Sequence, residues 1–175
     1  MFSKYRPTWT VDALYHLDTE ELAQQKIKGV LVDLDNTLIA WNNPDGTPEL
    51  LAWIAAMKEA GIPVVVVSNN SAKRVDHAIA PFGLMYVSRA MKPFTRGLKK
   101  AQQKLNIPNE NLVMVGDQLM TDIKAANSFG IRSILVKPLV ESDAWNTKIN
   151  RAREKVVKKN IFPTGITWER KLIND

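Results

Sequence analysis

Short runs of apolar and β-branched residues alternate with helical segments from residue 28 onward, and this alternation limits the fold more than any other feature. Five runs have the length and composition of buried strands: KGVLVDL (28–34), IPVVVVS (62–68), and residues 84–88, 111–115 and 131–136. Helices are predicted between them at residues 48–60, 71–82, 92–105 and 119–129. Strands that alternate with helices build a parallel sheet. The chain is therefore predicted to adopt a Rossmann-like α/β fold, with helices on both faces of the sheet.

The composition fits one ordinary globular unit and excludes several other classes of protein. Of the 175 residues, 45% are apolar, which allows a sizeable core and excludes intrinsic disorder. The absence of cysteine excludes thiolate zinc sites, cysteine nucleophiles and disulfide scaffolds. We expect a single domain over residues 1–175, with a core at about 28–140 and a basic C-terminal helix and tail at about 143–175.

Polar side chains follow the predicted strands at their carboxyl ends. They are Asp33 and Asp35 after the first, Ser68 and Asn69 after the second, Lys92 after the third, and Asp117 and Asp122 after the fourth. Ligands of open parallel sheets bind beyond this edge, so these side chains are predicted to meet in one pocket. Carboxylates that converge repel one another unless a cation lies between them, and carboxylate oxygens are ligands that Mg²⁺ prefers. The sequence therefore predicts a magnesium site.

The spacing of Asp33 and Asp35 suits a reaction at phosphorus. In an extended chain, side chains two residues apart point to the same side, so both carboxylates can approach one substrate. One carboxylate can attack phosphorus, and the other can protonate the leaving alcohol and later take a proton from water. Lys92 and Ser68 supply a positive charge and a hydroxyl donor that suit a phosphoryl group.

Four motifs in order resemble those of the haloacid-dehalogenase superfamily of phosphatases. They are DLDNT (33–37), Ser68 after VVVV, Lys92 in a Lys-Pro pair, and GDQLMTD (116–122). The resemblance implies that Asp33 is the nucleophile and Asp35 the general acid and base. It implies that Ser68, Asn69 and Lys92 bind the phosphoryl group, and that Asp33, the Asp35 backbone carbonyl and Asp117 bind Mg²⁺. Asp122 and Thr37 would support these groups.

The residues of these motifs resemble those of the YqeG group. The segment PLVESD (138–143) and the basic helix that follows it add to the resemblance. That group is related to phosphatidylglycerophosphate phosphatases, so the resemblance implies phosphatidylglycerophosphate as the substrate. A phosphate at a nucleic-acid end and a small sugar phosphate remain alternatives. The alternative hypothesis to an enzyme is a regulatory module that binds phosphate or metal without turnover.

The spacing of the motifs leaves no room for the inserted cap domain that many members of this superfamily carry. Only 30 residues separate Thr37 from Ser68, and 23 separate Ser68 from Lys92. One predicted helix and one predicted strand occupy most of each interval. An open pocket suits a phosphate carried on something large, such as a lipid, or one covered by a neighbouring subunit of a homo-oligomer.

Basic residues are concentrated in the C-terminal tail. The net charge of the chain is +6, and residues 146–175 hold eight basic against three acidic side chains. A helix is predicted over residues 146–160, with Ile149, Ala152, Val156 and Val157 on one face. This helix could lie on an anionic membrane, bind nucleic acid, or pack on the domain with its charges in solvent.

We expect a cytoplasmic protein, with peripheral contact at the inner membrane surface as an open alternative. No apolar run approaches the roughly 20 residues that a bilayer span requires. The first ten residues lack the apolar segment of an export signal.

Overall fold

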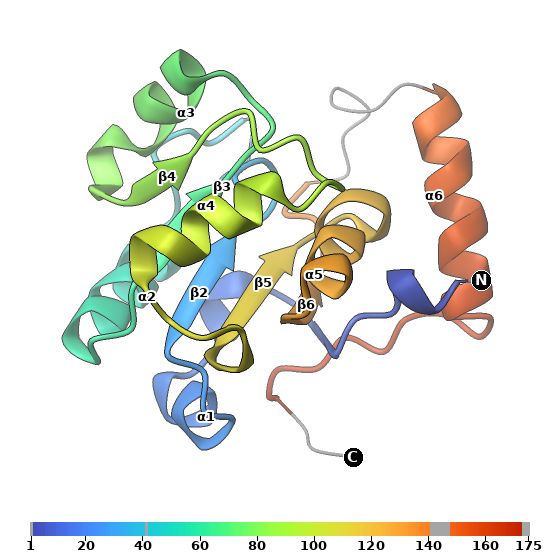
Figure 1. Cartoon of the computed structure of the whole chain (residues 1–175), viewed down its shortest axis with the longest axis horizontal. Coiled ribbons are helices and arrows are strands. Elements are labelled where there is room, and N and C mark those ends of the chain that lie inside the picture. The colour runs from blue at the N-terminus through green and yellow to red at the C-terminus, as the bar shows by residue number, and fades with distance from the viewer. Residues whose placement is uncertain (1, 41, 141–147, 173–175) are drawn as a thin grey trace.

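The computed structural model describes residues 2–40, 42–140 and 148–172, and its centre is a parallel six-stranded sheet (Figure 1). The strands are β1 (Trp9–Val11), β2 (Gly29–Val32), β3 (Val64–Val67), β4 (Met85–Val87), β5 (Leu112–Gly116) and β6 (Arg132–Val136). Their order across the sheet is β1-β6-β5-β2-β3-β4, and every neighbouring pair is parallel. The predicted Rossmann-like α/β fold is confirmed.

Helices cover both faces of this sheet, and α4 and α5 lie together on the face toward the viewer in Figure 1. The helices are α1 (Thr19–Gln24), α2 (Pro48–Glu59), α3 (Ala72–Ile79), α4 (Arg96–Leu105), α5 (Lys124–Phe129) and α6 (Lys148–Ile161). In β3, Val66 packs in the cluster that includes Trp53 of α2, whereas Val65 packs in the cluster that includes Leu98 of α4. Burial on both faces explains why this strand is a continuous apolar run.

Local sequence signals set the starts of two helices close to their predicted positions, although the helix predicted at residues 71–82 ends at Ile79 and a 3₁₀ turn follows it. The Thr47 hydroxyl accepts the backbone N–H of Leu50 and caps α2, whose first residue is Pro48. The Ser71 hydroxyl accepts the N–H of Arg74 and caps α3 in the same way. These caps satisfy N–H groups that have no partner within a helix.

The helix predicted at residues 92–105 begins later than expected, at Arg96. The backbone groups of Lys92 are already bonded elsewhere, because the side-chain amide of Asn69 accepts its N–H at 2.8 Å and donates to its carbonyl at 3.0 Å. Lys92 is thereby held beside the end of β3 instead of in the first turn of α4.

The helix predicted at residues 119–129 is present, but it is not uniform. Its first part, η5 (Leu119–Ile123), is a π-helical turn, and α5 continues from it. Single π-helical turns are rare and occur often at functional sites. Asp122 lies within this turn.

Sequence patterning missed β1, which lies at one edge of the sheet. Trp9 pairs with Ile134 of β6, and Val11 also forms a bridge with Glu169 near the C-terminal end of the described chain. The strand has only three residues, too few for an alternating pattern to be distinguished from an irregular segment. The N-terminal and C-terminal segments thus meet at this edge.

The intervals between the motifs contain no separate domain within the described residues. Thr37 and Ser68 are joined by a short bridged loop (Asp35 with Ile39, and Ala40 with Asn43), then by α2 and β3. Between Ser68 and Lys92 the chain forms α3, a 3₁₀ turn and β4. No cap domain is evident.

The basic tail contains α6, which packs on the domain through a stripe that shares only Val157 with the described part of the predicted face. Val157 and Ile161 are buried in a cluster with Leu119, Ile123 and Leu135, whereas Ala152 and Val156 are exposed. The predicted apolar face was therefore wrong for these two residues, because the buried stripe runs from Val157 to Ile161, one turn apart. Residues 146 and 147 lie outside the described part of the chain. Among the described residues, no helix has both the length and the apolarity needed to cross a bilayer.

Replacing Val157 with Ala should lower the free energy of unfolding by about 2 kcal/mol, because two buried methyl groups are lost and a cavity remains. The same change at the adjacent Val156, which is 56% exposed, should alter stability by less than about 0.5 kcal/mol. Urea denaturation of the two variants measures the difference. Equal effects would contradict docking of α6 through Val157.

Candidate active site

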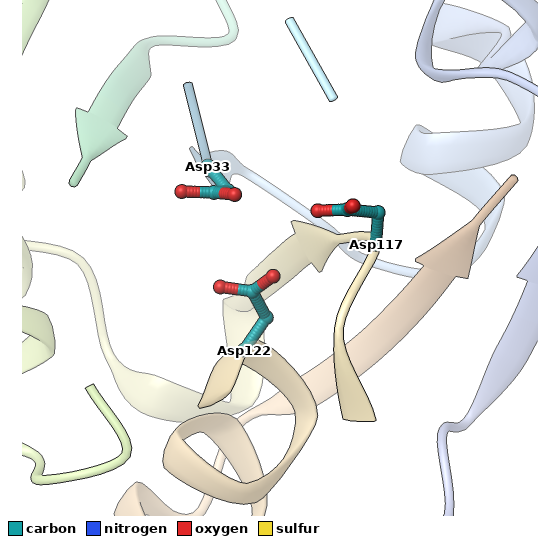
Figure 2. Close-up of side chains that lie close together, drawn as sticks. All are labelled: Asp33, Asp117 and Asp122. Carbon is teal, nitrogen blue, oxygen red and sulfur yellow. The ribbon is translucent and has the colours of Figure 1, made fainter. Parts of the chain in front are cut away.

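Three carboxylates meet at the carboxyl edge of the sheet, as Figure 2 shows. Asp33 follows β2, Asp117 follows β5, and Asp122 belongs to η5. Each offers an oxygen, and these oxygens all lie within 4.8 Å of one another. The sheet itself fixes part of this geometry, because the N–H of Asp33 donates to the carbonyl of Val115 at 3.0 Å.

Lys92 is the positive charge of this cluster. Its ammonium Nζ lies 2.8 Å from Oδ1 of Asp33 and 2.7 Å from Oδ1 of Asp122, and its side chain is only 2% exposed. Burial by itself lowers the pKa of Lys92, but the charges of Asp122 and Asp33 outweigh it and hold the pKa above the ordinary value. The lysine is therefore charged, and it ties β2 to η5.

One ammonium does not balance three carboxylates. Burial, followed by repulsion from Asp33 and Asp122, raises the pKa of Asp117 well above its ordinary value. Burial and the charge of Asp33 raise the pKa of Asp122 to about 7, although its bonds to Lys92 oppose the shift. A cluster of oxygen donors that is short of positive charge fits a hard divalent cation. The donor set could therefore hold such an ion.

The Asp35 side chain lies apart from this cluster. Its Oδ2 accepts the side-chain amide of Asn70 at 2.5 Å, and its Oδ1 lies 3.3 Å from Nη2 of Arg74. Burial and the charge of Asp33 raise the pKa of Asp35, while Arg74 and Asn70 lower it in part. The two carboxylates of the first motif thus have different surroundings, one beside Lys92 and the other beside α3.

Ser68 and Asn69 line the end of β3. The Ser68 hydroxyl is buried and accepts the N–H of Asn70 at 3.1 Å, which leaves its own hydrogen for donation. Both polar atoms of the Asn69 side chain bond the backbone of Lys92. Asn69 therefore fixes the position of the lysine loop relative to β3.

Two further residues of the motifs fit closely around the carboxylates. Thr37 donates its hydroxyl hydrogen to Oδ1 of Asp117 at 3.2 Å and is itself buried. A Cβ at Gly116 would lie 2.3 Å from Cγ of Asp122, which no side chain could tolerate. The glycine before Asp117 is thus required because the Asp122 carboxyl group occupies the space beside it.

Sequence analysis missed one residue near the site, Glu154 of α6. Its carboxylate accepts the N–H of Leu119 at 2.7 Å and that of Met120 at 3.2 Å, so the tail helix caps the turn that carries Asp122. Burial raises the pKa of Glu154, and these two bonds oppose the shift. The one available signal was that Glu154 is the sole acid in a strongly basic helix.

The structure thus brings Asp33, Lys92, Asp117 and Asp122 into one cluster, with Thr37 in contact with it. Asp35, Ser68 and Asn69 lie beside them at the ends of β2 and β3. Asp122, which the sequence suggested only as a supporting residue, is one of the three clustered carboxylates. Of the PLVESD segment, residues 141–143 lie outside the described chain, and Leu139 donates its N–H to the carbonyl of Asn36 at 3.0 Å.

Comparisons with known proteins identify the family of the chain. A HAD-hydrolase-like family profile matches residues 89–160. The chain is 37% identical over 166 residues to the probable phosphatase YqeG of Bacillus subtilis, covering 94% of this chain and 96% of that protein. It is 29% identical over 136 residues to the chloroplastic phosphatidylglycerophosphate phosphatase 1 of Chlamydomonas reinhardtii, covering 73% of this chain and 51% of that protein.

A solved structure supports the same fold. An uncharacterized protein from Listeria monocytogenes serotype 4b superposes with a TM-score of 0.53 at 17% identity, covering 76% of this chain and 99% of that one. At this identity the likeness concerns the fold alone.

A divalent cation that binds at this carboxylate cluster should stabilise the folded protein. With Mg²⁺ as the probe at 100 times its dissociation constant, the gain is about 2.7 kcal/mol, visible as a higher unfolding temperature. Asp117→Asn should remove most of the shift, whereas Asp76→Asn, on the exposed side of α3, should retain it. Thermal unfolding with MgCl₂ and with EDTA provides the measurement. An undiminished shift in Asp117→Asn would rule out the cluster as the binding site.

Proposed function

Because the chain belongs to the YqeG family of haloacid-dehalogenase-type phosphatases, we propose that it hydrolyses phosphatidylglycerophosphate through a phosphorylated Asp33. One observation carries the proposed mechanism. A carboxylate, Asp33, lies against a buried ammonium at 2.8 Å within a carboxylate cluster suited to a divalent cation, and Asp35, two residues along the chain, carries a carboxyl group with a raised pKa. Nucleophile, charge stabilisation and proton donor are thus available at one edge of the sheet.

In the first step, a carboxylate oxygen of Asp33 attacks phosphorus. A bond from Asp33 to phosphorus forms, the ester P–O bond breaks, and the leaving oxygen takes the proton of Asp35. In the second step, Asp35 accepts a proton from water, the water oxygen attacks phosphorus, and the bond to Asp33 breaks. Inorganic phosphate leaves, and both carboxyl groups return to their starting forms.

The surroundings of Asp35 support its role as the acid and base. Asn70 and Arg74 bond its carboxyl group and fix it near α3. Burial raises its pKa, which favours the protonated form needed to meet the leaving group. Asp33, which bonds Lys92, remains available as the nucleophile.

Lys92 and Ser68 bind the transferred phosphoryl group, Asn69 keeps the Lys92 loop in place, and Asp122 orients the ammonium. Asp33, the Asp35 backbone carbonyl and Asp117 would hold Mg²⁺, while Thr37 orients Asp117. The ion supplies positive charge that offsets the charge developing on the phosphoryl oxygens. The residues of this chain thus provide a ligand set as well as a nucleophile.

The absence of a cap domain in the described residues and the chloroplastic relative both support a lipid substrate. No cap domain is evident in the described residues, so a phosphate on a bilayer surface could reach the carboxyl edge of the sheet directly. A relative at 29% identity is named a phosphatidylglycerophosphate phosphatase, although the chain spans about half of its length. A phosphate at a nucleic-acid end and a small sugar phosphate are the alternative substrates. A homo-oligomer whose neighbouring subunit covers the site is the alternative to a bilayer.

The tail helix supports a peripheral position at an anionic membrane from the cytoplasmic side. Val157 and Ile161 occupy the face that packs on the domain, whereas Arg153, Lys155 and Lys159 are exposed. Each basic residue near an anionic surface contributes about 1 kcal/mol of attraction, which salt weakens. The charges of α6 would thus attract the enzyme to such a surface without belonging to its pocket.

Asp33→Asn should abolish Mg²⁺-dependent hydrolysis of an aryl phosphate, because an amide cannot form the phosphoryl bond. We expect kcat to fall on the order of 10³-fold or more, as with loss of a nucleophile in other hydrolases. Asp76→Asn serves as the matched control and should retain wild-type activity. Brief reaction with a ³²P-labelled substrate should label wild-type protein and leave Asp33→Asn unlabelled. Retained turnover in Asp33→Asn would refute the mechanism.

The substrate assignment predicts that kcat/KM for the lipid phosphate in anionic vesicles exceeds the values for a 3′-phosphorylated oligonucleotide and for sugar phosphates. A tenfold difference corresponds to about 1.4 kcal/mol in transition-state binding. Phosphate release from each substrate under one set of conditions provides the comparison. Preference for a soluble sugar phosphate by tenfold or more would overturn the lipid assignment.

A further inference from the structure

The loop that carries Lys92 also carries the two most exposed large apolar side chains among the described residues. Met91 is 59% exposed and Phe94 is 69% exposed, whereas Lys92 between them is buried. The N–H of Phe94 donates to the carbonyl of Met91 at 2.9 Å, so the two residues close one turn. This turn, residues 91–94, lies at the same edge of the sheet as the carboxylate cluster.

The turn is held firmly, so the exposure of its apolar side chains is not the result of a loose loop. Arg89 and Ala90 donate their N–H groups to the carbonyls of Asn70 and Ser68, at 2.8 and 2.9 Å. The Asn69 side chain fixes both backbone groups of Lys92. On the other side, Gly97 of α4 packs against Ala90 so closely that a Cβ there would lie 2.4 Å from the alanine Cβ.

The backbone of the loop is also strained in the place where it exposes these side chains. Arg89 has a φ of 46° and Met91 a φ of 57°, in the left-handed region that disfavours residues with a Cβ. Strained residues persist only where the surrounding contacts fix them, and they occur often at functional positions. Here the strain accompanies a reversal that directs Lys92 inward and leaves Met91 in solvent.

Several basic residues lie close to the exposed turn along the chain or through a backbone bond. Arg89 and Arg96 flank it in the sequence, and both are exposed. Lys73 and Arg74, also exposed, lie in the first turn of α3, which the bond from Arg89 to Asn70 connects to this loop. Arg74 also pairs with Asp35, so Arg89, Arg96 and Lys73 are the charges that count here. An apolar tip with basic residues beside it is complementary to the boundary between anionic headgroups and acyl chains.

A bilayer fits this turn better than a protein partner does. A specific protein interface buries on the order of 1,000 Å² or more, with a contiguous apolar centre. Other large apolar side chains with high exposure belong to separate elements: Leu51 to α2, Met85 to β4 and Val156 to α6. Individual side chains of a rigid turn can enter the headgroup boundary without such an area.

We propose that Met91 and Phe94 insert into the headgroup region of an anionic bilayer and thereby turn the carboxyl edge of the sheet beside Lys92 toward the membrane surface. The inference rests on the proposed function, in which the substrate phosphate is carried by a lipid. It differs from attraction by α6, because insertion is apolar, is confined to the turn and orients the pocket. The lysines of α6 supply attraction at a distance, and the turn supplies the contact.

A site-specific probe tests the insertion directly. The chain contains no cysteine, so Phe94→Cys provides a single labelling position for an environment-sensitive fluorophore. With vesicles of phosphatidylcholine and phosphatidylglycerol, the label at position 94 should shift to shorter wavelength. The matched label in Leu51→Cys, on half-exposed Leu51 of α2, should not shift. Identical responses at both positions, or no response at position 94, would overturn the proposal. A shift that depends on protein concentration without vesicles would assign the turn to a second copy of the chain instead.

Paired variants separate the turn from the tail helix and from the chemistry. Met91→Ser/Phe94→Ser should reduce vesicle binding and turnover of the vesicle-borne lipid phosphate tenfold or more, and the loss should persist at high salt. Lys155→Gln/Lys158→Gln/Lys159→Gln should reduce both at low salt only, since salt screens charge. Aryl-phosphate turnover should stay at the wild-type level in each.

The outcomes distinguish the two proposals from each other. If the wild-type protein does not hydrolyse the lipid phosphate but the label at position 94 still inserts, the substrate assignment fails and the docking turn stands. If the lipid phosphate is hydrolysed and Met91→Ser/Phe94→Ser binds vesicles as the wild type does, the docking turn fails alone. Equal losses on aryl and lipid substrates would show that the turn supports the pocket, which also overturns the proposal.

Discussion

The buried ammonium of Lys92 is the interaction on which the rest of the site depends. A charged group removed from water is costly unless it is paired and hydrogen-bonded, and Lys92 has both Asp33 and Asp122 within 2.8 Å. Removing it would leave those carboxylates beside each other and beside Asp117 with no cation among the described side chains of the cluster. The surrounding structure serves this pairing: Asn69 fixes the backbone of the lysine, and Gly116 leaves space for the Asp122 carboxyl group. The position of the Lys92 side chain thus explains why Gly116 and Asn69 are needed at their positions.

The charge of the cluster also constrains what can enter it. Three ionised carboxylates and one ammonium sum to −2, and a phosphate monoester near neutral pH brings nearly two further negative charges. A substrate would be repelled unless positive charge were added first or a carboxyl group were protonated. Burial is the main cause of the raised pKa values of Asp117 and Asp122, and repulsion from the neighbouring carboxylates adds to it. Divalent-cation binding and phosphate binding are therefore coupled through electrostatics.

The sequence was sufficient to predict the parallel sheet and the meeting of polar residues at its carboxyl edge, because both follow from short-range patterns. A valine run such as that of β3 indicates a strand buried on both faces, and parallel strands must place Asp33, Ser68 and Asp117 at one edge. The features that were missed depend on contacts between distant segments. β1 is defined by its pairing with β6, and the role of Glu154 by its bonds to Leu119 and Met120.

The start of α4 and the buried face of α6 were also predicted incorrectly, because contacts with distant segments decide them. Residues 92–95 have a helix-compatible sequence, yet the Asn69 amide takes up the backbone groups of Lys92. In α6, a helical wheel places Val156 and Val157 on one face, but of these two residues only Val157 is buried against the domain. Periodicity predicts which residues share a face; it does not tell which edge of that face will be buried, since the partner surface decides this.

The loop that carries Lys92 buries the catalytic-site ammonium and exposes apolar side chains in the same turn. The backbone reversal at Met91 that exposes one apolar side chain belongs to the same anchored turn that buries Lys92. Ser68, Asn69 and Asn70 hold the loop through hydrogen bonds. The tip of the loop and the Lys92 ammonium are therefore held in a fixed position relative to each other. A surface that receives Met91 and Phe94 would therefore meet the pocket at a fixed distance and orientation. No cap domain is evident among the described residues, so the surface that presents the phosphate would orient the substrate in place of a cap.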